Sequence, residues 1–345
     1  MSSVDYKSAG VNIDAGNEAV ERIKKSVKST FNSNVLTGIG SFGSLFDLKS
    51  IISEYKNPVL VQSIDGVGTK TIIARKMNKY DTIGIDLVSA CCNDITVMGA
   101  RPITFLDYVA NDKLNPAIIE QIVSGIAKSC KDNDIALVGG ETAEMPDTYL
   151  KGEHDLVGIV TGIVDKDKII DGSQIKNGDI VLGLPSTGLQ TNGYSLARKL
   201  FFEIGNYNVD DKIPAFNKSI GETLLETSHI YNPYVQALLD NNVKINGMAH
   251  ISGGGLVENI PRILPNNCAV EIIKNSWNIL PIFKQMHKLG NIPESEMFRT
   301  FNMGIGLVII VPKNEVDKIK SQLKVKISIY EIGKVIKGNR IVKFS

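Results

Sequence analysis

The chain has 345 residues, which exceeds what one hydrophobic core usually supports, so its length predicts two domains. Its 38 Lys and Arg residues balance 37 Asp and Glu residues, and this balance argues against bulk attraction to nucleic acid or to an anionic membrane. No apolar run is long enough to span a membrane, no signal peptide is visible, and the four cysteines lack Cys-x-x-Cys spacing. We therefore expect a cytoplasmic protein with reduced thiols that binds small ligands.

The chain opens with a polar segment, residues 1–16, that we interpret as a flexible arm, and continues with an amphipathic helix from about Asn17 to Lys28. Lys24 lies on the basic face of this helix. A solvated surface charge is the ordinary interpretation of such a lysine, and a phosphate contact is the alternative.

A β-branched apolar run at 59–64 leads directly into Asp65-Gly66-Val67-Gly68-Thr69-Lys70. An acid at the end of a strand can reach a metal ion, the glycines let backbone N–H groups approach an anion, and Lys70 adds a positive charge. The spacing fits neither a Walker A motif nor Gly-x-Gly-x-x-Gly. Taken alone, the hexapeptide is also compatible with a simple turn.

Residues 81–99 read as a buried helix that carries Asp86, Asn93 and Asp94 on one stripe. Burying carboxylates is costly unless a cation compensates, so we favour a stripe that faces a metal ion. The alternative is a core acid paired with a nearby cation, for which Arg101 is the local candidate.

A third acidic position follows the strand-like run 135–138, in the sequence Gly139-Gly140-Glu141. Carboxylate and amide oxygens at Asp65, Asn93, Asp94 and Glu141 are the hard ligands that suit Mg²⁺. Stabilisation of a helix N-terminus is the alternative role for Glu141.

Strand-like runs at 59–64, 103–109, 135–138 and 156–164 alternate with helix-like runs at 71–78, 81–99 and 116–131. A polar linker spans 165–179, and a second α/β-patterned region restarts at residue 180. We therefore divide the chain into domains 1–168 and 169–345. In the second domain, His250 and Ser252-Gly253-Gly254-Gly255 form a strand-to-helix turn, which predicts an anion or substrate site.

These motifs, in this order, resemble the phosphoribosylformylglycinamidine cyclo-ligase (aminoimidazole ribonucleotide synthetase) family over nearly the whole chain. The segments that carry the resemblance are 6–17, 38–43, 65–70, 84–88, 93–94, 105–108, 138–146, 191–196, 249–255, 258–262 and 299–304.

The resemblance implies a mixed α/β (α+β) fold with an N-terminal ATP-binding half, whose sheets pair across a homodimer, and a C-terminal α/β sandwich that completes the substrate site. It implies ATP-dependent ring closure of formylglycinamidine ribonucleotide with Mg²⁺, and it leaves a monovalent cation such as K⁺ open. The alternatives are a relative such as thiamine-monophosphate kinase, or a homologue that binds nucleotide with weakened catalysis.

Carried over to this chain, the resemblance implies three groups of site residues. ATP would contact Lys24, Gly38, Gly40, Gly43, Asp65, Gly66, Gly68, Thr69 and Lys70. Mg²⁺ would be held by Asp65, Asn93, Asp94 and Glu141. Substrate would be bound by Asn192, Ser252, Gly253 and Gly254, with His250, Lys70 and Gln190 as the catalytic candidates.

Gln190 departs from the family pattern, which usually has histidine two residues before Asn192-Gly193. Glutamine can donate a hydrogen bond but cannot exchange a proton near neutral pH. We therefore expect an orienting or charge-stabilising role at this position, with His250 left for proton transfer.

Overall fold

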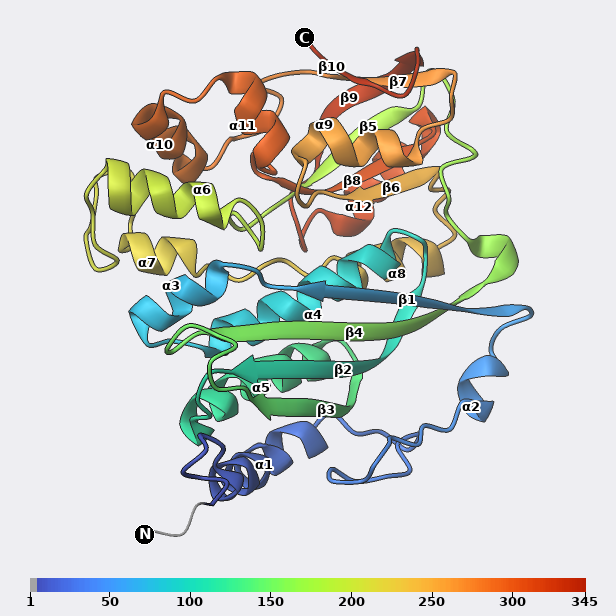
Figure 1. Cartoon of the computed structure of the whole chain (residues 1–345). Helices are drawn as coiled ribbons and strands as arrows, with labels where there is room; N and C mark the ends of the chain where they lie inside the picture. The colour runs from blue at the N-terminus through green and yellow to red at the C-terminus, as the bar shows by residue number, and fades with distance from the viewer. Residues whose placement is uncertain (1–4) are drawn as a thin grey trace. The chain divides into compact units, whose positions relative to one another are not determined.

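The computed structural model describes residues 5–345, which form two compact units of mixed α/β structure (Figure 1). Unit 1 contains residues 5–95 and Pro102–Lys166, and unit 2 contains Thr96–Arg101 and Asp167–Ser345. The expected α/β fold class is confirmed. The chain passes from unit 1 to unit 2 after Lys166, two residues before the predicted domain boundary at 168. Thr96–Arg101 also belong to unit 2, so the units are not two consecutive halves of the chain.

Unit 1 is built on a four-stranded sheet with the order β1-β4-β2-β3. Its strands are β1 (Pro58–Gly66), β2 (Arg101–Asn111), β3 (Ala136–Glu144) and β4 (His154–Asp165). β1 pairs antiparallel to β4, whereas β2 and β3 are parallel. α5 (Pro116–Asp132) connects β2 to β3, as a parallel pair requires.

The strands extend beyond the apolar runs that predicted them. Asp65 pairs opposite Gly158 within β1, and Glu141 pairs opposite Tyr108 within β3. Asp65 is the second-last residue of β1, as expected for an acid at a strand end, whereas Glu141 lies inside β3, so only the expectation that Glu141 follows its strand is wrong. The backbone ladder continues through polar residues because it depends on neighbouring N–H and C=O groups, not on the side chains that mark the apolar pattern.

Five helices complete unit 1: α1 (Ile13–Lys28), α2 (Lys49–Ile52), α3 (Lys70–Met77), α4 (Asp81–Thr96) and α5 (Pro116–Asp132). α1 starts four residues before the predicted Asn17, because the Asn12 side chain accepts a hydrogen bond from the backbone N–H of Ala15 at 3.3 Å. The predicted arm is thus helical from Ile13, and its residues 1–4 lie outside the described part of the chain.

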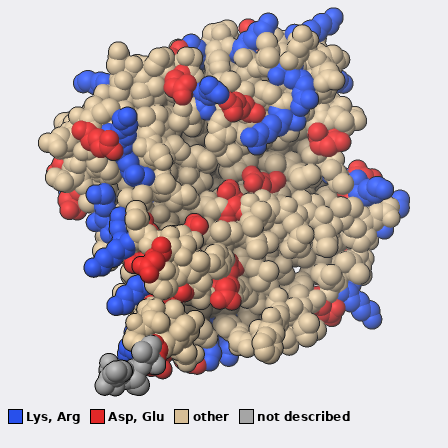
Figure 2. All heavy atoms as spheres, viewed as in Figure 1, with Lys and Arg blue, Asp and Glu red and all other residues tan. Residues whose placement is uncertain are grey.

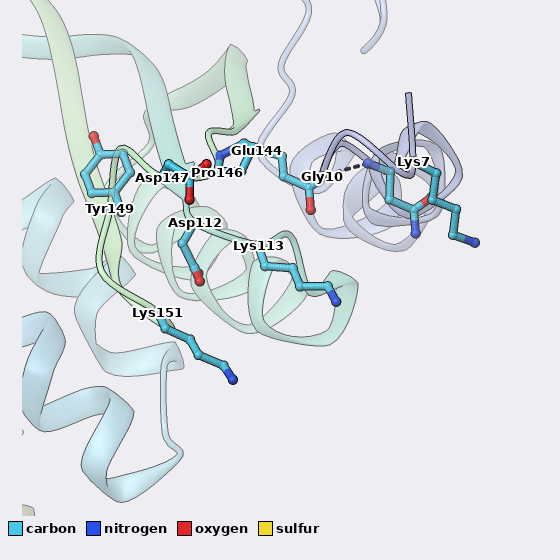
Figure 3. A pocket seen from close by; sticks show the side chains of 10 residues that line it. Lys7, Gly10, Asp112, Lys113, Glu144, Pro146, Asp147, Tyr149 and Lys151 are labelled. Carbon is cyan, nitrogen blue, oxygen red and sulfur yellow. Dashed lines mark hydrogen bonds between the residues drawn. The ribbon is translucent and has the colours of Figure 1, made fainter. Parts of the chain in front are cut away.

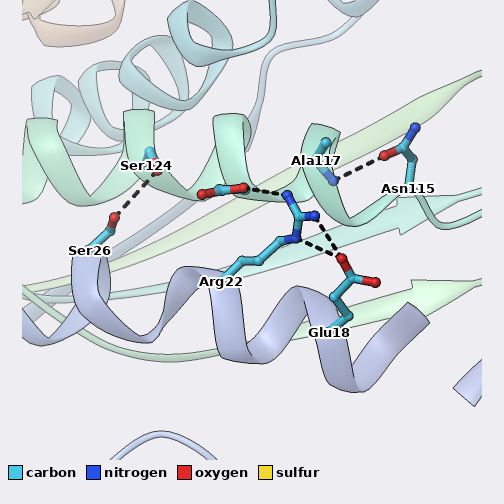
Figure 4. A network of polar contacts seen from close by, with 7 residues as sticks. Glu18, Arg22, Ser26, Asn115, Ala117 and Ser124 are labelled. Atoms are coloured by element: carbon cyan, nitrogen blue, oxygen red, sulfur yellow. Dashed lines mark hydrogen bonds and ion pairs between the residues drawn. The ribbon is translucent and has the colours of Figure 1, made fainter. Parts of the chain in front are cut away.

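Polar contacts fix α1 against α5 (Figure 4). The guanidinium of Arg22 donates to Glu18 on its own helix at 2.7 Å and to Glu120 on α5 at 2.9 Å. One turn along α1, the hydroxyl oxygens of Ser26 and Ser124 lie 3.4 Å apart. These side chains, spaced by four residues, define the α5-facing stripe of α1.

Unit 2 contains a six-stranded sheet with the order β10-β7-β9-β5-β8-β6. Its strands are β5 (Ile180–Pro185), β6 (Gly247–His250), β7 (Cys268–Ile272), β8 (Ile305–Val311), β9 (Tyr330–Lys337) and β10 (Val342–Phe344). Its helices are α6 (Tyr194–Arg198, continued by a π-helical stretch Lys199–Ile204), α7 (Ile220–Leu224), α8 (Asn232–Asp240), α9 (Gly255–Asn259), α10 (Pro281–Gly290), α11 (Glu294–Thr300) and α12 (Val316–Leu323). Every residue of β8 is buried, so this strand is the centre of the unit 2 core.

The surface of neither unit shows a field of one charge on the visible face (Figure 2). Lys and Arg side chains are interspersed with Asp and Glu side chains there, which agrees with the balanced composition. Within residues 5–345, no helix combines the length and hydropathy that a membrane-crossing segment needs.

Candidate functional site

Two of the predicted metal ligands face the same part of unit 1, between β1 and α4. The hydroxyl of Ser63 on β1 donates to Asp94 Oδ2 on α4 at 3.2 Å. Asp65 lies two residues after Ser63, and hence on the same face of the strand. Burial raises the pKa of the Cys91 thiol well above its usual range, and the charges of nearby Asp65 and Asp94 raise it further. Asp65 and Asp94 therefore both lie near this inert thiol, and we call them the acidic pair of unit 1.

Glu141 does not join that pair. It lies on β3, and the sheet order puts β4 and β2 between β3 and β1. Three strand spacings amount to about 14 Å, whereas Mg²⁺ holds its oxygen ligands at about 2.1 Å. The structure thus does not gather Asp65, Asp94 and Glu141 around one point, and no three His, Cys, Asp or Glu side chains among residues 5–345 cluster as metal ligands. Asn93 is fully buried in α4 beside Asp94.

Lys70 and Asp86 form an ion pair in the interior of unit 1. The Nζ of Lys70, at the start of α3, lies 2.6 Å from Asp86 Oδ2 on α4, and both side chains are fully buried. The predicted partner Arg101 instead pairs with Asp240 at 3.3 Å, within unit 2. Asp86 is therefore a core acid paired with a cation and does not belong to a metal-facing stripe, but the cation is Lys70 from another helix and not Arg101.

A cavity of about 730 Å³ lies beside β3 in unit 1. It contains the predicted glycine loop, including Gly38, Gly40 and Gly43, together with Glu141 and the neighbouring Gly139 and Gly140. Gly40 has φ +96°, which an L side chain rarely adopts, so the loop depends on glycine there. Lys24 does not line this cavity and pairs with Glu21 on its own helix.

Asp107 on β2 is the buried acid of this cavity. Its side chain is 9% exposed, and burial raises the pKa of its carboxyl from 3.8 to about 7. A Cβ at Gly140 would lie 2.3 Å from Asp107 Oδ1, so the glycine makes room for the carboxyl. Residues 105–108 contributed to the family resemblance, but sequence reasoning gave Asp107 no role. The signal in the sequence that could have identified it is an acidic residue within an otherwise apolar strand.

A second hollow of unit 1, about 520 Å³, lies near the N-terminal turn (Figure 3). Lys7, Lys113 and Lys151 line it together with Asp112, Glu144 and Asp147, so its charges do not favour one sign of ligand. Glu144 has a structural task here, because its carboxylate accepts from the backbone N–H groups of Asn12 at 2.6 Å and Leu114 at 2.9 Å.

In unit 2, the predicted substrate turn follows β6, whose last residue is His250, 9% exposed. The side-chain amide of Asn259 donates to the carbonyls of Gly253 at 3.1 Å and Gly255 at 2.9 Å, and also reaches that of Ser252 at 3.3 Å. A Cβ at Gly253 would lie 3.1 Å from Asn192 Oδ1. The structure thus brings Asn192 to the turn formed by Ser252, Gly253 and Gly254. Sequence reasoning missed Asn259, the residue that pins this turn.

Gln190 is held in the interior of unit 2. Its side chain is 3% exposed, and its Nε2 donates to the hydroxyl of Tyr231 at 3.3 Å. That hydroxyl donates in turn to the Pro185 carbonyl at 2.8 Å. The backbone of Gln190 has φ +64°, a left-handed conformation.

The loop before Gln190 is fixed by Asn302, a second amide that sequence reasoning left without a role. Asn302 Nδ2 donates to the Gly188 carbonyl at 2.9 Å, and Oδ1 accepts from the Ser186 hydroxyl at 2.8 Å. Asn302 therefore holds the loop that leads to Gln190, while the Gln190 side chain is held separately by Tyr231.

Two family models cover most of the chain. The one described as AIR synthase related protein, N-terminal domain, matches residues 49–164, and the C-terminal domain model matches residues 176–344. Among solved structures, thiamine-monophosphate kinase from Stenotrophomonas maltophilia K279a has a TM-score of 0.70 at 17% identity, covering 95% of this chain and 96% of that one. The hydrogenase maturation protein HypE from E. coli has a TM-score of 0.66 at 16% identity, covering 95% and 94%. At such low identity these structures support the fold alone.

Curated relatives are much closer in sequence. A protein named phosphoribosylformylglycinamidine cyclo-ligase from Thermoanaerobacter pseudethanolicus is 50% identical over 336 residues, covering 97% of this chain and 98% of the relative. A protein of the same name from Crocosphaera subtropica is 49% identical over 342 residues, covering 98% of each. The resemblance found in the sequence is confirmed: this chain belongs to the phosphoribosylformylglycinamidine cyclo-ligase family and is a ligase.

Proposed function

We propose that this enzyme closes the imidazole ring of aminoimidazole ribonucleotide from formylglycinamidine ribonucleotide, with hydrolysis of ATP to ADP and phosphate, in purine biosynthesis. The observation that carries the proposal is the 50% identity to a cyclo-ligase over 97% of this chain. A kinase acting on thiamine monophosphate is the weaker candidate, since its structural likeness comes with 17% identity.

The chemistry requires activation of an amide oxygen, which is a very poor leaving group. In the proposed reaction, the formamide oxygen attacks the γ-phosphorus of ATP, ADP leaves, and a phosphorylated formamide (iminophosphate) forms. The amidine nitrogen then attacks the activated carbon within the same molecule, phosphate departs with the former amide oxygen, and loss of a proton from nitrogen leaves the aromatic ring. Both steps depend on positioning and charge stabilisation more than on a covalent enzyme intermediate.

Unit 1 is the proposed nucleotide half. Gly38, Gly40 and Gly43 would close over ATP in the cavity beside β3, with Gly66, Gly68 and Thr69 giving backbone contacts and Lys24 a phosphate contact. Lys70 would act on phosphate only indirectly, because its ammonium is buried against Asp86.

The acidic pair Asp65 and Asp94 has the oxygen donors that Mg²⁺ prefers, and Asn93 adds an amide on the same helix. Glu141 would serve a separate position at the nucleotide cavity. When bound, Mg²⁺ would neutralise phosphate charge during transfer. The proposal leaves open a monovalent cation such as K⁺, which the assay below includes.

Unit 2 is the proposed substrate half. Asn192, Ser252, Gly253 and Gly254 would bind the ribonucleotide, and His250 would move protons beside them. Gln190 would orient this region through its hydrogen bond to Tyr231 rather than exchange a proton.

The enzyme is proposed to work as a cytoplasmic homodimer. Leu60 and Ile64 on the edge strand β1 are 57% and 67% exposed, which is the apolar surface that a paired sheet would cover. Ile64→Glu should convert a dimer to a monomer in sedimentation analysis. A monomeric wild-type protein would contradict this part.

The experiment that tests the reaction measures aminoimidazole ribonucleotide and ADP from purified protein given formylglycinamidine ribonucleotide, ATP, Mg²⁺ and K⁺. Thiamine monophosphate and selenide serve as rival substrates. Turnover of thiamine monophosphate or selenide, without turnover of formylglycinamidine ribonucleotide, would contradict the cyclo-ligase proposal.

A further inference from the structure

The cavity beside β3 is unsuited to a bare anion. Its charged lining residues, within the described part of the chain, are the acids Asp107 and Glu141, and no lysine or arginine lines it. Much of the remaining wall is apolar, including Val20, Ile23 and Val27 on α1. Such a wall favours a flat, uncharged ring and disfavours phosphate oxygens.

Asp107 gives this wall one specific polar group. No side chain or backbone donor of another described residue contacts its carboxyl, although the side chain is only 9% exposed. Its own backbone N–H is the one donor that lowers the pKa of this carboxyl, and a buried carboxylate with so few donors is costly, so a ligand that supplies a further N–H group would be stabilised here. Gly140 leaves room at Oδ1, where a Cβ would come within 2.3 Å.

Phe42, on the glycine loop, is the aromatic side chain that would cover a ring bound in this cavity. It lines the cavity and is fully exposed, and it lies between Gly40 and Gly43, around which no atom comes within 4 Å of an added Cβ. An aromatic side chain on an open glycine loop can stack on a planar base, and stacking does not require hydrogen bonds to that base.

We propose that this cavity takes the purine base of ATP, that Asp107 accepts a hydrogen bond from the exocyclic amino group of adenine, and that Phe42 stacks on the ring. The inference rests on the proposed function in assuming an ATP substrate, and it adds the choice of base. Guanine and hypoxanthine carry a carbonyl oxygen where adenine carries the amino group, so an ionised Asp107, which can only accept, discriminates against them.

The test is direct nucleotide binding by isothermal titration calorimetry to the full-length protein with Mg²⁺, using ATP and inosine triphosphate, whose base is hypoxanthine. The wild type should prefer ATP by at least about tenfold. Asp107→Leu should weaken ATP binding by about tenfold or more and bring the ATP to inosine triphosphate ratio close to one. Asp107→Asn keeps an acceptor oxygen in the same shape and should keep most of the ATP affinity.

Two further variants serve as controls. Phe42→Ala should weaken both nucleotides about equally, because stacking does not distinguish the two bases at this position. Asp132→Asn removes an exposed charge at the end of α5 and should change neither affinity.

Equal binding of the two nucleotides by the wild type would overturn the inference, and this measurement needs no variant to fold. So would an unchanged ratio in Asp107→Leu. This result can be distinguished from a failure of the proposed reaction. If the enzyme closes the ring but its preference for ATP does not depend on Asp107, only the base site is rejected. If the preference for ATP depends on Asp107 but no ring closure occurs, only the cyclo-ligase reaction is rejected.

Discussion

The two units bury different kinds of polar group. Unit 1 buries charged groups in or beside its sheet: Lys70, Asp86 and Asp107 are each at most 9% exposed. Unit 2 mainly buries amides, including Gln190, Asn259 and Asn302, and these side chains donate to backbone carbonyls or to a tyrosine hydroxyl. Its buried acid Asp179 is satisfied by Asn246 at 2.7 Å and by the backbone N–H of Lys176 at 3.0 Å.

This difference separates two tasks. A buried amide can be satisfied completely by neutral partners, so it fixes loops at modest cost. A buried carboxylate that lacks such neutral donors needs a cation, a metal ion or a ligand. The buried charges of unit 1 therefore indicate where ligands bind, and the buried amides of unit 2 indicate where turns are fixed.

The largest expected effect follows from breaking the ion pair of unit 1. Lys70→Met leaves Asp86 without its cation and should lower the free energy of unfolding by about 3–5 kcal/mol, measured by urea denaturation. The double variant Lys70→Met/Asp86→Leu removes both charges and should recover much of the loss. An unchanged stability in the single variant would mean that the pair contributes nothing to the fold.

Asp107 predicts a pH dependence with a definite sign. Burial raises the pKa of its carboxyl from 3.8 to about 7, so the folded state holds the proton more tightly than the unfolded state. This contribution to stability is complete below about pH 4 and is lost as the pH rises to 7.

Asp107→Asn stays neutral and should therefore gain stability relative to the wild type between pH 4 and 8, by up to about 4 kcal/mol. Thermal unfolding of both proteins across this range measures the difference. Parallel pH profiles would show that the buried carboxyl ionises as easily in the folded state as in the unfolded chain.

Asp94→Asn tests whether the acidic pair of unit 1 acts in catalysis. The substitution keeps the side-chain shape but removes a charge, so activity should fall by at least about 100-fold with the fold intact. Asp132→Asn is the matched control, because it removes an exposed charge. A collapsed melting temperature with normal turnover of the folded fraction would assign Asp94 a structural role instead.

Much of the architecture of unit 1 could be predicted from the sequence, because its four strands contain apolar runs and its helices α4 and α5 are long apolar segments. Asp65 and Asp94 lie near the same thiol, that of Cys91, and their shared role in binding a metal ion stays a prediction. The Lys70–Asp86 pair could not be predicted, since its partners lie on different helices and their meeting depends on packing. Separation of Glu141 from Asp65 depends on strand order, which local patterns do not contain. The short elements α7, α11 and β10 were missed for want of a periodic pattern long enough to recognise.

In unit 2, His250→Ala should lower the rate of ring closure by about 100-fold if the histidine moves protons beside the Ser252–Gly255 turn. His287→Ala, an exposed histidine on α10, is the control and should leave the rate unchanged. A fully active His250→Ala enzyme would leave proton handling to substrate and water.

The smallest effect is expected at Gln190, where unit 2 departs from the family pattern. The side chain is buried and donates to Tyr231 at 3.3 Å, and its left-handed backbone conformation at φ +64° is one that histidine also adopts. A neutral histidine can donate the same hydrogen bond, so Gln190→His should change the rate by less than about tenfold. Gln190→Ala loses the hydrogen bond and leaves a cavity, and its rate should fall moderately, less than that of His250→Ala. If Gln190→His instead accelerated ring closure by far more than tenfold, the position would be a proton-transfer site that glutamine serves poorly, and the contrast between a charged unit 1 and a neutral, orienting unit 2 would fail at this residue.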